Sequence, residues 1–308
     1  MKKLFLALVL LTAFGIKLYA QDDLMKMLEE DSKKEKKKDY ATATFKTSRL
    51  INGHSIENVA AGVLDVKISH RFGMVNRGSY EFFGLDQATM RMGLDYGISN
   101  RLMVGFGRST FQKQYDAFYK FKILRQSKGG RGSSPISISA VSTVMLKTLK
   151  WEDPKRQNYY TSRVSYAHQL IIARKFSESV SFQLMPSFIH YNLAQGATDP
   201  NDIFALGGGG RIKLSKRLSF NFEYYHILPI SLVAGEGYRI PGTKNSIAVG
   251  FDIETGGHVF QLQFTNSTGM TEKTFITETT GDFFKGDIHF GFNLSRVFTI
   301  KNRKSKKH

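Results

Sequence analysis

Alternation of apolar and polar side chains constrains this chain more than any other feature of its sequence. In residues 88–110, ATMRMGLDYGISNRLMVGFGRST, every second residue from Met90 to Ile98 is apolar, and the residues between them are polar or glycine. Successive side chains of a strand point to opposite faces of a sheet, so the stretch predicts a strand with one apolar face. The short turn at 99–101 leads into a second alternating run, and the pair predicts a β-hairpin.

The hairpin pattern repeats along residues 63–300. Short connections near residues 99, 130, 177, 216 and 256 alternate with longer ones near residues 80, 113, 154, 197, 236 and 276, although the connection near 113 is itself short. Outer-membrane barrels have short periplasmic turns, longer outer loops and an even number of strands. We therefore predict an all-β fold, a transmembrane antiparallel β-barrel of about twelve strands, with both termini in the periplasm. A soluble β-sandwich shares the alternation but does not need this rhythm of loops.

The two ends of the chain carry different predictions. Residues 1–20 combine Lys2 and Lys3 with an apolar run at 4–16 and a small residue at Ala20, the pattern of a secretory signal peptide. The apolar run is shorter than the about 20 residues that a spanning helix needs. An exported barrel belongs in the outer membrane of a Gram-negative cell. The absence of cysteine leaves its stability to hydrogen bonds and packing.

The segments that flank the predicted barrel are irregular. Residues 21–39 are mostly charged and predict a solvated periplasmic linker, with binding of a periplasmic protein as the alternative. Residues 40–62 do not follow the alternation of the hairpins. We expect them to lie in the periplasm or to fold into the lumen as a partial plug, and an ordinary extra strand is the alternative. Residues 301–308 form a basic tail.

Charge points to partners and to a lining of the lumen. The net charge is +18, and it is +15 once Lys2, Lys3 and Lys17 leave with the signal peptide. On an exported chain this basic balance favours anionic lipid headgroups or anionic solutes over nucleic acid. The predicted lumen-lining residues are Lys67, Arg71, Arg91, Asp95, Lys120, Lys122, Lys147, Arg163, Arg211, Lys213, Glu223 and Asp252, and Asp65, Asp116 and Glu254 share their faces. Two alternatives follow: a basic-lined channel that favours anionic solutes, or internal salt bridges that fill a closed barrel.

We predict neither a catalytic site nor a cofactor. The eight histidines are scattered without metal-binding spacing, and there is no cysteine to assist them. The glycines at 207–210 lack the Lys-Ser/Thr of a phosphate-binding loop and predict a bend or room for a plug. A lipid-facing phospholipase would need an outward serine and histidine together. Ser162 and His168 share that face but lie ~20 Å apart along one strand, and pairing across strands cannot be deduced from sequence.

Two runs carry a family resemblance: TFKTSRLINGHSIENVAAGVLDVKISHRFG at residues 44–73 and FFGLDQATMRMGLDYGISNRLMVGFGRS at residues 82–109. They resemble a family of predicted outer-membrane β-barrels of Bacteroidota catalogued as domain of unknown function 5777. The resemblance extends over nearly the whole mature chain and implies a barrel in the outer membrane, but no substrate, cofactor or catalytic residue. Its density within residues 44–62 favours a special structural task for that segment, such as the plug.

The functional prediction is a non-enzymatic outer-membrane barrel in contact with lipid. Its leading form is a channel or porin-like pore for small solutes, with anionic solutes favoured by the basic wall. The alternatives are a structural or assembly barrel that binds a periplasmic partner through residues 21–39, and, less favoured, a lipid-facing enzyme such as a phospholipase.

Overall fold

The computed structural model describes residues 25–26, 38–151, 153–155, 157–194, 196 and 198–301. The predicted signal peptide, most of the charged linker and most of the basic tail therefore lie outside the described residues. The chain divides into two compact units, one of residues 1–40 with 127–133 and one of residues 41–126 with 134–308. Among the described residues, no helix is long and apolar enough to cross a membrane.

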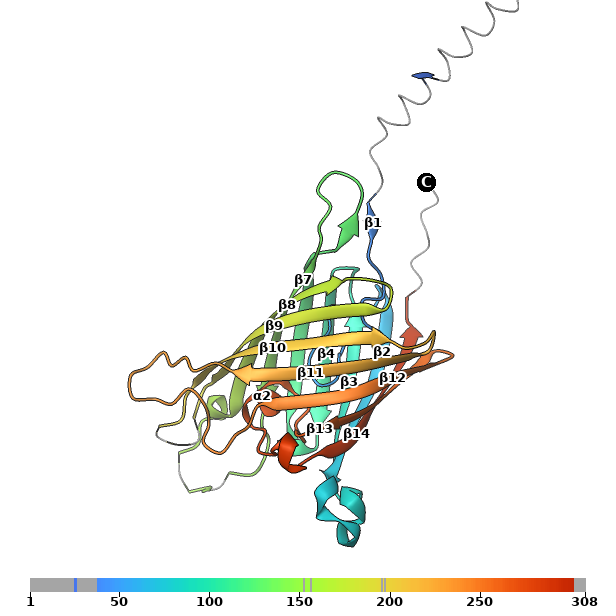
Figure 1. Ribbon diagram of the computed structural model, residues 1–308. Helices are drawn as coiled ribbons and strands as arrows, with labels where there is room; N and C mark the ends of the chain where they lie inside the picture. Colours follow the sequence, from blue (N-terminus) through green and yellow to red (C-terminus); the bar gives the residue numbers. More distant parts are fainter. Residues whose placement is uncertain are drawn as a thin grey trace, which may run out of the picture. The chain divides into compact units, whose positions relative to one another are not determined.

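The second unit is a closed antiparallel barrel, as predicted. Its twelve strands are β2 (Val63–Met74), β3 (Ala88–Gly97), β4 (Leu102–Ser109), β5 (Tyr115–Leu124), β7 (Ser137–Leu146), β8 (Val164–Lys175), β9 (Val180–Tyr191), β10 (Asp202–Lys213), β11 (Leu218–Ile227), β12 (Ser246–Thr255), β13 (His258–Thr265) and β14 (His289–Thr299). Each strand pairs with the next one along the wall, and β14 pairs with β2 to close it (Figure 1).

The two ends of the barrel differ in their connections. The chain reverses within residues 98–101, 176–179, 214–217 and 256–257 at one end, the short-turn end. At the opposite, long-loop end it runs through residues 75–87, 110–114, 147–163, 192–201, 228–245 and 266–288 before the next strand, and of these only 110–114 is short. Ile300 N donates to Gly62 O at 2.9 Å, so the barrel begins and finishes at the short-turn end.

One connection differs from the turn that the sequence predicted near residue 130. Residues 127–128 form a short strand, β6 (Ser127–Lys128), which pairs antiparallel with β1 (Asp39–Tyr40). Asp39, assigned to the linker, and Tyr40, assigned to the plug segment, thus belong to a ladder in the first unit. The pairing joins residues that are far apart in the chain, and a local sequence pattern cannot predict such a contact.

The two faces of the barrel wall carry different side chains. Outward positions are mainly apolar and exposed, for example Met92, Leu94 and Phe106, which suits contact with lipid. Part of the inner wall of β7–β11 is apolar as well, which the sequence analysis missed. Its buried members include Val141, Met145, Ile171, Met185, Ile189, Ile203 and Tyr225. Phe45, Leu50 and Ile56 pack into this cluster, together with Phe275 and Ile276 of α2 (Glu272–Thr277).

Candidate functional site: the filled barrel interior

Residues 41–62, hereafter the inner segment, lie against the inward side chains of the wall. The segment reverses direction at Asn52-Gly53, a dipeptide typical of tight turns. Leu50 N donates to Gly53 O at 2.8 Å, and Ser55 N donates to Ser48 O at 3.0 Å. The strand that the sequence allowed within this segment does not form, apart from isolated bridges between Arg49 and His54 and between Ala61 and Gly97.

Glu223 of β11 holds the tip of this turn. Its carboxylate accepts hydrogen bonds from three consecutive main-chain groups: Ile51 N at 3.2 Å, Asn52 N at 3.3 Å and Gly53 N at 3.1 Å. Converging main-chain N–H groups form a concavity that favours an anion. Glu223 is 2% exposed, so the turn tip supplies the hydrogen bonds that water would otherwise provide.

Lys120 of β5 holds the two arms of the turn. Its Nζ donates to Ser48 O at 3.2 Å and to Ser55 O at 3.0 Å, and also to Glu57 O. The side chain is 0% exposed. Three carbonyl oxygens of the inner segment therefore replace the hydration shell of the ammonium group.

Polar side chains from other strands complete this ring of main-chain contacts. These bonds include Gln261 Nε2 to Leu50 O at 2.8 Å, Asn293 Nδ2 to Ile51 O at 3.0 Å, Gln183 Nε2 to His54 O at 2.8 Å and Arg211 Nη1 to Ala43 O at 3.1 Å. The strands that contribute lie around the whole wall, from β5 through β9, β10 and β11 to β13 and β14. The inner segment is thus bound through its backbone on all sides.

Helix α2 reaches the same place from the long-loop end. It begins with a capping box in which Thr271 and Thr274 exchange hydrogen bonds, and all six of its residues are buried. Glu272 Oε1 lies 2.6 Å from Arg49 Nη1 and 3.4 Å from His54 Nε2. The His54 ring also packs edge-on against Phe118, with centroids 4.5 Å apart. Burial, reinforced by Arg49, Lys120 and other nearby cations, lowers the pKa of His54 well below 6.5.

Several predicted lumen residues pair with one another. Arg91 Nη2 lies 2.5 Å from Asp116 Oδ2, and Lys67 Nζ lies 2.7 Å from Asp95 Oδ2. Others reach the inner segment or neighbouring wall residues. These contacts are Arg71 Nη2 to Asn52 Oδ1 at 2.9 Å, Lys122 to Glu57 at 3.9 Å, Lys46 to Glu254, Asp65 with Ser295 at 2.6 Å and Asp252 with Gln261 at 2.8 Å. Charged groups of the inner wall thus find partners within the barrel.

Three of the predicted residues lie apart from this interior. Lys147 follows the last residue of β7, Lys213 is the last residue of β10, and both are only half-buried. Arg163 ends the 3₁₀ helix Tyr160–Arg163, and its guanidinium stacks on the ring of Trp151 at 3.4 Å. For Lys147 and Arg163 the prediction extended the alternation beyond the strand ends, where the chain forms a long loop. Lys213 does belong to β10, but it lies at the short-turn rim of the barrel, just before the turn at 214–217.

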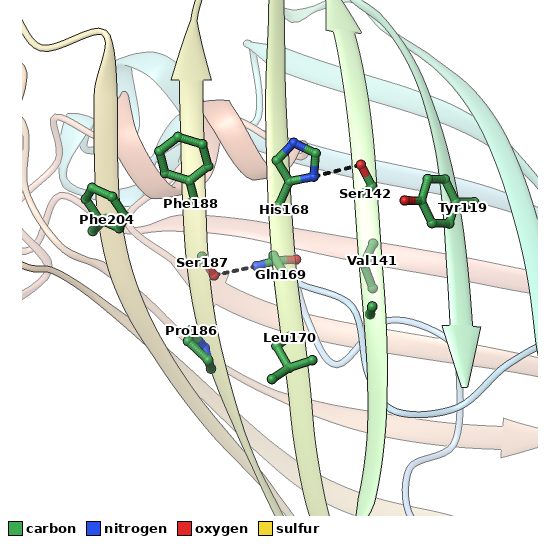
Figure 2. Close-up of a pocket in the computed structure, with 11 residues that line it drawn as sticks. Tyr119, Val141, Ser142, His168, Gln169, Leu170, Pro186, Ser187, Phe188 and Phe204 are labelled. Atoms are coloured by element: carbon green, nitrogen blue, oxygen red, sulfur yellow. Dashed lines mark hydrogen bonds between the residues drawn. The ribbon is translucent and has the colours of Figure 1, made fainter. Parts of the chain in front are cut away.

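A hollow of about 410 Å³ lies on the outward face of β5, β7, β8, β9 and β10. Figure 2 shows Ser142 and His168 side by side within it, Oγ to Nδ1 at 2.8 Å, on directly opposed residues of β7 and β8. Sequence reasoning considered Ser162 instead, whose hydroxyl bonds Tyr159 O. Among the described residues no side chain bonds His168 Nε2, so the pair lacks the third group that orients a catalytic base.

A second hollow, of about 420 Å³, opens at the long-loop end. Arg71, Arg77, Thr89, Glu278 and His289 are among the residues that line it. Within the described parts of the chain, no three His, Cys, Asp or Glu side chains come together as a metal site would require.

Comparison with known proteins gives a family and several distant structures. A family model described as "Membrane bound beta barrel domain (DUF5777)" matches residues 45–298. The NanC porin is 10% identical over 77% of this chain and 98% of its own, with a TM-score of 0.47. The KdgM porin is 9% identical over 77% and 99%, with a TM-score of 0.43. An outer membrane channel from Pseudomonas putida F1 is 12% identical over 79% and 98%, with a TM-score of 0.47. The search of curated proteins gives no match.

Proposed function

The chain belongs to the Membrane bound beta barrel domain (DUF5777) family, and from this premise we propose that it is an outer-membrane pore for small solutes, closed at rest by its own inner segment. The observation that carries the proposal is the pair Lys120 and Glu223. Both are fixed on the wall and buried, and both form their hydrogen bonds with the main chain of the inner segment.

The charged groups of such a wall can be satisfied in two states of the barrel. With the inner segment in place, its charges are satisfied by carbonyl oxygens and amide groups. With the segment withdrawn, only water can satisfy them, because a buried charge without a partner costs several kcal/mol. A charged wall therefore favours a water-filled lumen as the second state, which is the condition for passage of a small polar solute. In that state Arg71, Lys120, Lys122 and Arg211 would lose contacts with the inner segment, against the carboxylates of Glu223, Glu254 and Glu272. This small excess of basic groups favours anions.

The same proposal places the protein in the cell. In this proposal the signal peptide predicted at residues 1–20 would direct export, the short-turn end would face the periplasm, and the charged linker predicted at residues 21–39 would be periplasmic. A pull or a partner acting on that linker would reach the closing segment directly. Short periplasmic turns and long outer loops are the orientation usual in outer-membrane barrels.

A structural or assembly barrel is the second candidate, and the apolar cluster favours it. Phe45, Leu50 and Ile56 of the inner segment pack among Met145, Met185 and other wall residues as a core would. In that case the segment never leaves, and the barrel serves to anchor residues 21–39 for a periplasmic partner. The two candidates differ in whether the lumen ever conducts ions.

Ion conductance in a planar bilayer distinguishes the two candidates. We would compare the full-length protein with Lys120→Met, which removes three hydrogen bonds to the inner segment and keeps the length of the side chain. Lys213→Met, at the half-buried end of β10, is the matched control. The proposal expects a nearly silent parent and control and a conducting Lys120→Met. Silence from all three, with folding verified by heat-modified electrophoretic mobility, would favour the structural barrel.

A further inference from the structure

We infer that the barrel interior is a peptide-binding site, occupied here by the chain's own residues 43–57, and that it accepts a separate peptide of the same kind. The inference rests on the proposed function, because the site must be vacated before another peptide can enter. It names the ligand class of that site: a peptide with an Asn-Gly turn flanked by apolar residues.

Recognition of main chain is the first argument. The wall contributes Arg211, Lys120, Gln261, Asn293, Gln183 and Glu223, which bind main-chain oxygens or nitrogens of residues 43, 48, 50, 51, 52, 53, 54, 55, 56 and 57. Every peptide carries these atoms, so such contacts select the path of a backbone rather than one particular side chain.

Shape selection at the turn is the second argument. A Cβ on Gly53 would lie 2.1 Å from Tyr225 Oη, so any larger residue displaces the turn or the tyrosine. Tyr225 is itself buried in the apolar cluster and cannot easily give way. The neighbouring Asn52 accepts a hydrogen bond from Arg71 through its Oδ1 at 2.9 Å. The site therefore recognises Asn-Gly specifically.

Apolar pockets on either side of the turn are the third argument. A Cβ on Gly209 of β10 would lie 2.3 Å from Leu50 Cδ2, so the glycine leaves a recess that this leucine fills. Phe45 and Ile56 enter the cluster of β7–β11 on the two arms. Backbone ligands, a fixed turn and three side-chain recesses together form a complete peptide site. The attached segment holds it at high effective concentration, so a free peptide competes only when that segment is weakened.

The experiment weakens the attached segment and leaves the wall intact. The full-length Gly53→Ala protein is mixed with a synthetic peptide of residues 41–62. One version of the peptide has the native sequence, and the other carries the Gly53→Ala change. Gly208→Ala is the matched control protein, because a Cβ there meets nothing closer than 3.7 Å. The readouts are binding of the fluorescently labelled peptide and conductance in a planar bilayer.

We expect the native peptide to bind Gly53→Ala and to reduce its conductance at least tenfold, and the altered peptide to need at least tenfold higher concentration. Gly208→Ala should bind neither. If the Gly53→Ala protein conducts but does not bind the native peptide, the peptide-binding inference is wrong, whereas the proposal of a pore closed by its inner segment is supported. If the Gly53→Ala protein binds the native peptide but conducts no ions either before or after the peptide is added, the inference is supported and the proposed pore is contradicted. If Gly53→Ala does not fold, Leu50→Asn weakens the segment at its recess instead, with the same outcomes.

Discussion

Arg49 Nη1 lies 2.6 Å from Glu272 Oε1, inside the barrel and with both side chains buried. The contact joins the inner segment, which enters from the short-turn end, to α2, which enters from the long-loop end. We expect Arg49→Met to lower the free energy of unfolding by about 3–5 kcal/mol, because it leaves the Glu272 carboxylate buried without its partner. Thermal unfolding in detergent micelles measures this as a lower midpoint.

A double-mutant cycle identifies the pair as the cause. Arg49→Met combined with Glu272→Met removes both charges, so the double variant should lose clearly less than the sum of the single ones. Lys244→Met, at a partly exposed ion pair with Asp282 of 3.8 Å, should change the free energy of unfolding by less than about 0.5 kcal/mol. Strict additivity of Arg49→Met and Glu272→Met would show that the contact contributes no coupling.

His54 gives the barrel a dependence on pH. Burial of the ring, and then the charges of Arg49, Lys120, Lys67 and Arg91, lower its pKa well below 6.5. The carboxylate of Glu272, whose Oε1 lies 3.4 Å from Nε2 of the ring, is bound by Arg49 through the same oxygen. Above about pH 6.5 His54 is neutral in both states, and its full contribution to stability is present. Below that value only the unfolded chain takes up the proton, so stability falls by at most about 1.4 kcal/mol per pH unit.

The measurement is the unfolding midpoint from pH 7.5 to 4.5 for the parent and for His54→Phe, which keeps a ring against Phe118. The difference between the unfolding midpoints of the two proteins should be constant above pH 6.5. Below pH 6.5 the midpoint of the parent should fall steadily relative to that of His54→Phe. Parallel curves over the whole range would mean that His54 takes up its proton equally in the folded and unfolded states.

The Ser142–His168 pair faces outward, and we expect it to be structural. Ser142→Ala leaves His168 Nδ1 without its partner in an apolar setting and should cost about 1 kcal/mol of unfolding free energy. Ser142→Ala with His168→Leu, which removes both polar groups, should recover most of that loss. The parent protein should release no fatty acid from phospholipid vesicles. Release that disappears in Ser142→Ala would instead assign the hollow to a lipid-facing hydrolase.

The sequence predicted the barrel because each strand carries its own alternation, which depends only on neighbouring residues. The residues that organise the interior were harder to foresee. Leu50 and Gln261 are separated by 211 positions, and Ser142 and His168 by 26, so their contacts follow from strand order and register rather than from local pattern. The inner apolar wall was missed because Ile171 and Met185 lie between outward residues that are apolar too, where alternation gives no contrast.

The central claim is that the inner segment closes a pore. Its most direct measurement is the ion conductance of the purified full-length protein in a planar bilayer, beside a variant that lacks residues 22–61. The account predicts a nearly silent full-length protein and steady conductance with a modest preference for anions in the shortened one. Equal conductance in both proteins, or silence from a shortened protein shown to be folded, would contradict it.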